Sequence, residues 1–270
     1  MNTSIKNQII SLAKLTPDRE ICGFIYYTKE NKLKIFPGNN ISVDPCRDFE
    51  IDPTEYIACH RLGVICGVYH SHVREEDGDA FSPCDLDYVE EIAVPLYLYS
   101  VTKDSWKEYI PETYDFELTR RPFIWGLYDC FSALRDGWRQ RRKIYIDDYD
   151  RDESFPVNQS SKHAILDNIE RFGGVVIGRG KKDLHKLEID DAILFNTSSR
   201  SRILPFHLGL FIGDSNFFHH PEDQLSCVDH LDGNWINRIN LIVRHKSLVN
   251  SSEIMCNNTL NKEIKGLEKD

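Results

Sequence analysis

The first part of the chain alternates between amphipathic and wholly apolar segments. Ile5, Ile9, Leu12 and Ala13 recur at helical spacing, so they share one face of an expected first helix. Further helices are expected where an Asp-Pro or Ser-Pro pair opens a segment, in "DPTEYIACHRLG" and "SPCDLDYVEEIA". Apolar runs typical of buried strands are "ICGFIYY", "KLKIFPG", "VICGVYHSH" and "VPLYLYSV". Helices and strands that alternate in this way predict an α/β sandwich over residues 1–105.

A second pattern begins after a stretch in which this periodicity is lost. Residues 106–120 mix charged and aromatic side chains, and we expect them to link two domains. Residues 121–248 open with a helix around "DCFSALRDGW" and a second helix from about Ser161. Short strands are expected in "DDAILFN", "FHLGLFIG", "NFFHH" and "INLIVRH", with a hairpin turn at "GDSN". This order predicts an α+β domain, and the polar residues 249–270 predict a flexible tail.

Composition and charge narrow the possible partners. The 270 residues are 41% hydrophobic and 28% charged, as in ordinary globular proteins, and they suffice for two hydrophobic cores. The net charge of −10 argues against a nucleic-acid groove, which needs a clustered positive field. The basic cluster from Arg139 to Lys143 lies at the end of an expected helix, where its positive charges interact favourably with the helix dipole. We therefore expect no nucleic-acid partner.

The sequence shows no sign of export or of membrane insertion. No early apolar run follows a basic start, so we expect no signal peptide, and no run reaches the length of a membrane span. Eight cysteines occur, none in a Cys-x-x-Cys pair, which favours reduced thiols over a disulfide framework. A cysteine with a chemical role must therefore be identified by its surroundings.

Two histidines close the third expected strand. His70 and His72 are separated by one residue, so both imidazoles point to the same side of the strand. Two neutral imidazoles and one carboxylate form the three-ligand shell of a catalytic zinc, with one position left for water. Asp85 is the expected third ligand, because the helix that starts at Ser82 can return it to the strand end. Glu20 lies just before a neighbouring strand and is the expected general base.

Each part of this set has an ordinary explanation. A His-x-His pair alone is more often an exposed strand end. Ser-Pro-x-Asp is explained as a helix cap followed by an aspartate whose negative charge interacts favourably with the helix dipole. The joint occurrence, in this order and on these elements, favours a metal site. Cys84, beside Asp85, is an alternative ligand, but the carboxylate at the helix start is favoured.

Three segments, "PDREICGF", "HSH" and "SPCD", resemble those of the JAMM (MPN-domain) metallopeptidases, over about residues 1–105. The resemblance implies a JAMM/MPN-like sandwich with a mixed central sheet. It also implies that zinc (Zn2+) is bound by His70, His72 and Asp85, while Glu20 shuttles the proton of the metal-bound water. The serine of "SPCD", Ser82, would help to hold the tetrahedral oxyanion. The sequence departs from the family after the second histidine, where the usual proline is a valine, and in a longer, acidic loop before the serine.

A second candidate site centres on Cys130, at or just before the start of an amphipathic helix. The helix dipole there is expected to lower the pKa of the thiol, and backbone N–H groups would serve an oxyanion. His207 begins one strand of the expected hairpin and His219 ends the next, so we expect the two imidazoles to lie near each other. A cysteine, a base and a residue that orients the base make a catalytic triad. The ordinary alternative is a buried core cysteine.

Four segments of the second domain resemble the NlpC family of cysteine peptidases, over about residues 118–245: "RPFIWG", "YDCFSALRD", "IDDAILF" and "HLGLFIGDSNFFHH". The resemblance implies a papain-like α+β fold in which the cysteine is the nucleophile, His207 the base and His219 the residue that orients it. Two positions depart from the family. Phe123 stands where many members have a tyrosine, and Asp190 stands where a glycine is customary.

The order of the two resemblances carries information of its own. A JAMM domain followed directly by an NlpC domain resembles the tail-tip assembly peptidases of long-tailed phages, over nearly the whole chain. This implies that the second domain hydrolyses peptidoglycan stem peptides or crosslinks, and that the first processes a tail protein, with a small ubiquitin-like one as a candidate. It also implies a place at the virion tail tip among other tail-tip proteins, after synthesis in the host bacterial cytoplasm, where Cys130 stays reduced.

Two other functions stay open at the level of the sequence. One is a bacterial deconjugating enzyme that removes ubiquitin-like tags, with the second domain as an accessory amidase; neighbouring genes for conjugation enzymes, rather than tail proteins, would favour it. The other is a catalytically silent plug of the tail tip. The plug is disfavoured because the sequence lacks neither a metal ligand nor a triad residue.

Overall fold

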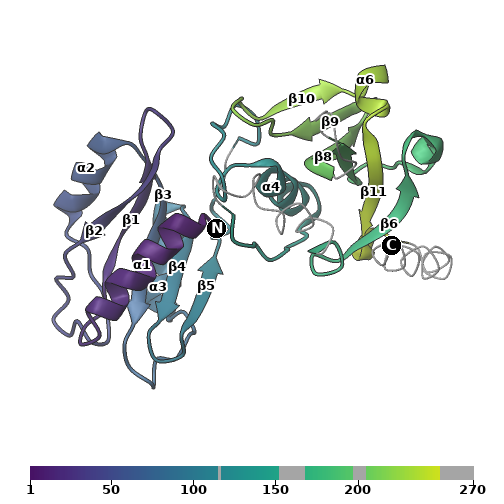
Figure 1. Ribbon diagram of the computed structural model, residues 1–270. Helices are drawn as coiled ribbons and strands as arrows, with labels where there is room; N and C mark the ends of the chain where they lie inside the picture. The colour runs from purple at the N-terminus through teal and green to yellow at the C-terminus, as the bar shows by residue number, and fades with distance from the viewer. Residues whose placement is uncertain (115–116, 152–167, 197–204, 250–270) are drawn as a thin grey trace. The chain divides into compact units, whose positions relative to one another are not determined.

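The computed structural model describes residues 1–114, 117–151, 168–196 and 205–249. The chain divides into two compact units, Met1–Phe116 and Glu117–Asp270, each with its own sheet (Figure 1). The helix expected from about Ser161 begins outside the described residues. Residues 250–270 of the expected tail also lie outside them.

The first unit is built on a mixed five-stranded sheet in the order β2-β1-β3-β4-β5. Strands β3 and β4 are parallel, and the other neighbouring pairs are antiparallel. The strands are β1 (Cys22–Tyr27), β2 (Leu33–Gly38), β3 (Val64–His72), β4 (Leu96–Ser100) and β5 (Ser105–Tyr109). The helices are α1 (Thr3–Leu15), α2 (Pro53–Leu62) and α3 (Pro83–Ile92). The expected alternation of helices and strands is confirmed for β1 to β4.

Helices lie on both faces of this sheet. Cys59 of α2 and Val89 of α3 pack in one hydrophobic cluster with Leu96 of β4. Helix α1 contacts β2 and β4, and the ammonium group of its Lys14 lies over the ring of Tyr99. Because successive side chains of a strand point to opposite faces, Tyr99 and Leu96 lie on different faces of the sheet. His70 of β3 pairs with Leu98, two residues from Leu96, so the His70 side chain lies on the face covered by α2 and α3.

Strand β5 lies in the segment 106–120, which the sequence predicted to be a linker. It pairs antiparallel with β4. Trp106 stacks on Tyr97 with ring centroids 5.8 Å apart, and Tyr109 packs against the hydrophobic cluster of α2 and α3. The linker prediction is therefore wrong for the start of this segment. The alternation was obscured because β5 is an edge strand, with charged residues such as Lys107 between its aromatic ones.

The second unit is built on an antiparallel six-stranded sheet in the order β10-β9-β8-β7-β11-β6. The strands are β6 (Gly174–Arg179), β7 (Ala192–Asn196), β8 (Pro205–Gly213), β9 (Asn216–His219), β10 (Cys227–His230) and β11 (Ile239–His245). The α-helices described are α4 (Cys130–Arg142) and α6 (Gly233–Ile236), and the short 3-10 helices are η1 (Lys181–Lys186) and η2 (Lys246–Leu248). Strands β6 and β10 were not expected from the sequence. In the described parts of both units, no helix is long and apolar enough to cross a membrane.

The two faces of the second sheet carry different clusters. Helix α4 packs on one face, where Trp138 is fully buried against residues such as Leu208. The other face carries Phe195 and Phe217, with Trp235 packed against them. Since neighbouring side chains alternate, His207 points to this second face, and its ring stacks on Phe195 at an interplanar angle of 28°.

Two short connections show why the sequence folds in this way. Asp214 and Ser215, with φ of 50° and 56°, form the expected two-residue hairpin turn between β8 and β9. Asp190, just before β7, also has a positive φ, 73°, a backbone conformation that favours glycine. Aspartate is tolerated because its carboxylate pairs with Arg141 and Arg142 of α4.

Gly209 of β8 is required because two aromatic side chains of the sheet pack closely against its backbone. A Cβ atom there would lie 2.6 Å from Cδ2 of Phe217 and 3.2 Å from Cε2 of Phe195. We expect Gly209→Ala to lower the free energy of unfolding by about 1–3 kcal/mol, measured by urea unfolding followed by circular dichroism. Gly233→Ala is the control, because a Cβ there meets nothing within 4 Å. Equal stability of the two variants would contradict this account.

Candidate functional site

The imidazoles of His70 and His72 lie side by side at the end of β3. Their Nε2 atoms are 3.3 Å apart, and both residues are buried, with 0% and 5% of their surface exposed. Phe49 stacks on the ring of His70 at a centroid distance of 4.5 Å, which fixes the orientation of that ring. The two nitrogens therefore point to a common position.

Asp85 faces the same position from the start of α3. Its Oδ2 atom lies 3.5 Å from Nε2 of His70 and 4.0 Å from Nε2 of His72. A capping box holds it, because Ser82 N–H donates to Oδ2 at 2.7 Å and Ser82 Oγ accepts from Asp85 N–H at 3.1 Å. Burial opposes the ionisation of Asp85, but the hydrogen bond to His70 and the capping contacts outweigh it and lower the pKa of the carboxyl. Asp85 is thus an ionised, fixed donor.

Glu20 lies at the same end of the sheet. It precedes Cys22, which pairs with His70, by two residues, and it is 1% exposed. Its backbone is anchored by Asn40 Nδ2, which donates to the Glu20 carbonyl at 3.0 Å, but its side-chain Oε1 has no hydrogen-bond partner. Burial, and then the charge of Asp85, raise the pKa of Glu20 to about 9. A buried carboxyl whose Oε1 has no hydrogen-bond partner thus lies at this end of the sheet, close enough to Asp85 for that charge to affect it.

His70, His72 and Asp85 fit a zinc ion. Their donor atoms all lie within 4.8 Å of one another. Tetrahedral zinc with bonds of about 2.0–2.2 Å places neighbouring nitrogen and oxygen ligands about 3.3–3.6 Å apart. The separations of 3.3 and 3.5 Å agree with this, and the 4.0 Å separation is slightly longer. Three donors leave one tetrahedral position open, as in catalytic zinc sites.

The neighbouring thiol and the acidic loop are arranged differently. Cys84 is exposed, whereas the adjacent Asp85 is buried against the histidines, which favours the carboxylate as third donor. In the loop between β3 and α3, Asp79 pairs with Lys107 of β5 at 3.2 Å, and Glu76 pairs with Arg74 at 3.2 Å. Part of the negative charge of the loop is therefore neutralised.

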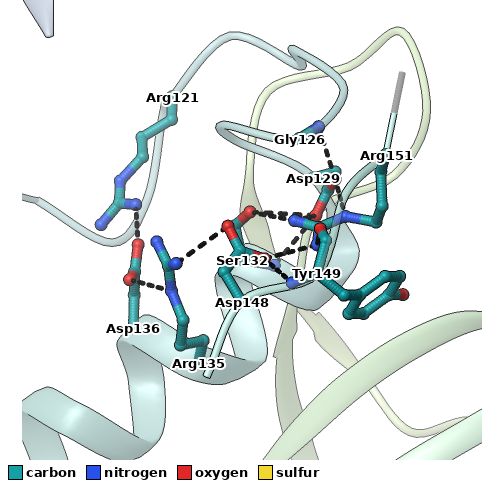
Figure 2. A network of polar contacts seen from close by, with 9 residues as sticks. All are labelled: Arg121, Gly126, Asp129, Ser132, Arg135, Asp136, Asp148, Tyr149 and Arg151. Carbon is teal, nitrogen blue, oxygen red and sulfur yellow. Dashed lines mark hydrogen bonds and ion pairs between the residues drawn. The ribbon is translucent and has the colours of Figure 1, made fainter. Parts of the chain in front are cut away.

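Cys130 is the first residue of α4, and its position is set by the residue before it. Asp129 caps the helix by accepting from Ser132 N–H at 2.9 Å and from Gly126 N–H at 2.8 Å. Arg151 donates its Nε–H to the same carboxylate at 2.7 Å, as Figure 2 shows. Asp129 is 0% exposed and Arg151 1%. The start of α4 is thus fixed by a buried ion pair.

This pair belongs to a network of alternating charges (Figure 2). Arg151 also donates to Asp148 at 2.5 Å, and Asp148 lies 3.0 Å from Arg135 of α4. Further along α4, Asp136 accepts from Arg121 at 2.6 Å. Acidic and basic side chains alternate through the cluster, so each buried charge has a partner of opposite sign.

The Cys130 thiol does not have the low pKa expected at a helix start. Burial, and then the charge of Asp129, raise its pKa to about 12, although the N–H of Leu208 and the charge of Arg151 act in the opposite direction. The expectation is wrong for this conformation because the thiol is 8% exposed, and the loss of water outweighs the helix dipole. The thiol is protonated at neutral pH, so its chemistry requires a base.

His207 and His219 meet across the β8–β9 hairpin. His207 Nε2 lies 2.7 Å from His219 Nδ1. Burial, and then the neighbouring imidazoles, lower the pKa of His207 to about 3, so its ring is neutral at neutral pH. A neutral imidazole that uses one nitrogen on a partner has the other nitrogen left for a proton.

The Cys130 thiol contacts the backbone of β8, the strand that carries His207. The N–H of Leu208, the residue after His207, is directed at the sulfur. The Cys130 side chain packs with α4 and Leu208, whereas the His207 ring stacks on Phe195 of the other face. The described contact of the Cys130 sulfur is therefore with the backbone of β8. A direct contact between this thiol and the His207 imidazole stays a prediction.

Another histidine lies near the start of α4. His220 is 1% exposed and makes an edge-on contact with Phe123, with ring centroids 5.2 Å apart. Burial lowers the pKa of His220 to about 4, against the opposing charge of Asp129. No pattern in the sequence predicts that this ring, rather than that of His207, lies on the α4 side.

Two further residues that the sequence reasoning missed surround His219. Asp229 Oδ2 lies 3.2 Å from His219 Nε2, and Cys227 Sγ lies 3.4 Å from the same nitrogen. Both come from β10, a strand that was not expected. Their only signal in the sequence was the Cys-x-Asp spacing, which places both side chains on one face once the strand is known.

Comparison with known proteins identifies relatives. Tail tip assembly protein K of Escherichia phage N15 is 28% identical over 235 residues, covering 85% of this chain and 89% of that protein. The chain is thus similar, over most of its length, to a phage tail tip assembly protein K. Tail tip assembly protein K of Escherichia phage lambda is 27% identical over 130 residues, covering 48% of this chain and 60% of that protein.

No protein-family model matches the chain. Among solved structures, the match to an NlpC/P60 family protein from Bacillus cereus covers 87% of this chain and 66% of that one, at 13% identity and a TM-score of 0.28. A TM-score this low does not establish a common fold.

The buried ion pair at the start of α4 can be tested by removing its cation. In Arg151→Met, Asp129 would keep its charge without its main partner. We expect the free energy of unfolding of the second unit to fall by about 3–5 kcal/mol, measured by urea unfolding. Arg171→Met, at an exposed position, is the matched control and should change stability little. A loss no larger than that of the control would contradict the role given to Arg151.

Proposed function

We propose that this chain acts at the phage tail tip as a protein with two peptidase sites, a zinc-dependent (iso)peptidase of JAMM type in the first unit and a cysteine peptidase of NlpC type in the second. The observation that carries the proposal is the buried convergence of His70, His72 and Asp85, at the same end of the sheet as Glu20, whose buried Oε1 has no hydrogen-bond partner. The relatives in phages N15 and lambda are tail tip assembly proteins, which supports a place in the virion tail among other tail-tip proteins.

In the first unit, His70, His72 and Asp85 would hold the metal. A bound Zn2+ lowers the pKa of its water to about 7 and polarises a carbonyl oxygen. Beside such a cation Glu20 would be ionised, because a nearby positive charge favours the carboxylate. Its Oε1, which has no other partner, would accept the proton of the water and pass it to the leaving amine. Ser82 keeps its O–H free to donate to the oxyanion, since its oxygen accepts the Asp85 N–H.

The substrate proposed for this zinc site is a protein of the tail that is processed during assembly. The JAMM resemblance points to peptide or isopeptide bonds, and a small ubiquitin-like tail protein is the candidate. The names of the relatives as assembly proteins support this choice.

In the second unit, Cys130 would attack the carbonyl carbon of a peptidoglycan stem peptide or crosslink. Its proton would pass to the free nitrogen of His207, whose other nitrogen is held by His219 at 2.7 Å. The leaving amine would take that proton, and water would then hydrolyse the thioester with His207 again as base. Backbone N–H groups at the start of α4 are available for the oxyanion. This activity would serve tail assembly or DNA entry into the host.

The zinc site predicts a specific loss of metal. We expect His70→Ala to lower the zinc content of the purified full chain by one ion per molecule, because it removes a buried donor. Zinc is measured by mass spectrometry of the metal after dialysis. His60→Ala, near the end of α2, is the control and should keep the full content. A chain that binds no zinc, or a content unchanged in His70→Ala, would support the silent plug instead.

The thiol site predicts a loss of hydrolysis without a loss of metal. We expect Cys130→Ala to lower the rate of muropeptide cleavage by roughly a thousandfold or more, because the nucleophile is removed, while the zinc content stays unchanged. Cleavage is followed by mass analysis of the fragments. Cys84→Ala, at an exposed thiol, is the control and should cleave normally. Cleavage that survives in Cys130→Ala but stops on chelation would show that the activities are assigned to the wrong units.

A further inference from the structure

Three donors of different kinds converge on the face of the β9–β10 pair that also carries Phe217. Cys227 lies directly opposite His219 in the antiparallel register, and Asp229, two residues on, shares the same face. His219 Nε2 lies 3.4 Å from Cys227 Sγ and 3.2 Å from Asp229 Oδ2, and Cys227 Sγ lies 3.9 Å from Asp229 Oδ1. An imidazole nitrogen, a sulfur and a carboxylate thus surround one position.

These separations match a tetrahedral metal shell. With bonds of about 2.0–2.2 Å to nitrogen and oxygen and about 2.3 Å to sulfur, neighbouring ligands lie about 3.3–3.6 Å apart. The 3.4 Å separation falls in this range, and the 3.2 Å separation is slightly shorter. The third, between Cys227 and Asp229, is longer at 3.9 Å, and a rotation of the Asp229 side chain, which is 43% exposed, would shorten it. We propose that His219, Cys227 and Asp229 form a second site for a divalent transition metal such as Zn2+, in addition to the site of His70, His72 and Asp85.

A simpler interpretation gives Asp229 alone a role, as acceptor of the His219 Nε2–H. In that interpretation the Cys227 thiol keeps its proton and donates a long hydrogen bond to Asp229 Oδ1 at 3.9 Å. The two interpretations therefore differ in whether the thiol is protonated. Cys227 is a free cysteine at an intermediate exposure, so its proton can leave to solvent as the sulfur–metal bond forms. Sulfur and imidazole together favour zinc over magnesium or calcium.

Occupation of this site would change the state of His207. One hydrogen lies in the 2.7 Å contact between His207 Nε2 and His219 Nδ1. With Asp229 as acceptor, His219 Nδ1 is unprotonated and receives the His207 Nε2–H, which leaves His207 Nδ1 as a base. With a metal on Nε2, His219 Nδ1 carries the hydrogen and donates it, so neutral His207 carries its own hydrogen on Nδ1. The metal would therefore inhibit the thiol peptidase, a consequence that rests on the proposed function.

Cobalt(II) tests the site by spectroscopy, whatever the activity. The full chain is stripped with a chelator and titrated with Co2+, and a thiolate-to-cobalt charge-transfer band in the near ultraviolet is sought. The site of His70, His72 and Asp85 has no thiolate ligand, so this band reports the second site alone. We expect the band in the wild type and in the double variant His70→Ala/His72→Ala.

The band should disappear in Cys227→Ser, and cobalt binding should weaken at least tenfold in Asp229→Asn. Cys84→Ser is the matched control, because Cys84 is an exposed thiol beside Asp85, and it should keep the band. Absence of the band in the wild type would overturn the proposal. So would its loss in Cys84→Ser with retention in Cys227→Ser.

A zinc titration of muropeptide cleavage tests the consequence separately. Cleavage by the wild type, relative to its own metal-free rate, should fall as zinc is added, and the fall should need at least tenfold more zinc in Cys227→Ser. Equal zinc sensitivity of the two proteins would overturn the coupling to His207. If neither protein cleaves muropeptides, the proposed peptidase function fails, while the cobalt band still decides whether the metal site exists.

Discussion

Helix α4 begins where a carboxylate accepts backbone N–H groups and is itself held by a buried guanidinium. An isolated charge in this interior would cost several kcal/mol, so Asp129 and Arg151 depend on each other, and Cys130 depends on both. The first unit uses a related arrangement with less charge. There Ser82 and Asp85 cap α3, and the carboxylate that caps the helix also faces the histidines. In both units a capped helix start brings side chains to the end of a strand.

The alternation of side chains between the two faces of a strand decides which side chains can meet at each site. His70 and His72 share a face because they are two residues apart, and the same rule groups Cys227 with Asp229. A register shift of one residue would turn each set to the opposite face. The same alternation explains why the Cys130 sulfur contacts the backbone of β8, while the rings of His207 and His219 lie with the aromatic cluster of the other face.

Much of this could be predicted from the sequence, because the informative elements are local. The apolar runs of β1, β3 and β4 and the caps of α2 and α3 are visible in a few consecutive residues. Strand β10 was missed because it is a short edge strand with exposed polar positions. The partner of Asp129 comes from an acidic loop 22 residues away, where nothing marks Arg151 as buried. The raised pKa of Cys130 follows from tertiary burial, which a helix-start pattern does not contain.

The left-handed residue before β7 has a consequence for how this chain changes over generations. Asp190 occupies a backbone conformation that suits glycine, and the two arginines of α4 neutralise its carboxylate. The three positions therefore form one evolutionary unit. Reversion to glycine would release Arg141 and Arg142 from selection, whereas loss of both arginines would leave an uncompensated anion in the interior. Among close relatives, an acidic residue here should be accompanied by a basic pair one helix away, and a glycine should not.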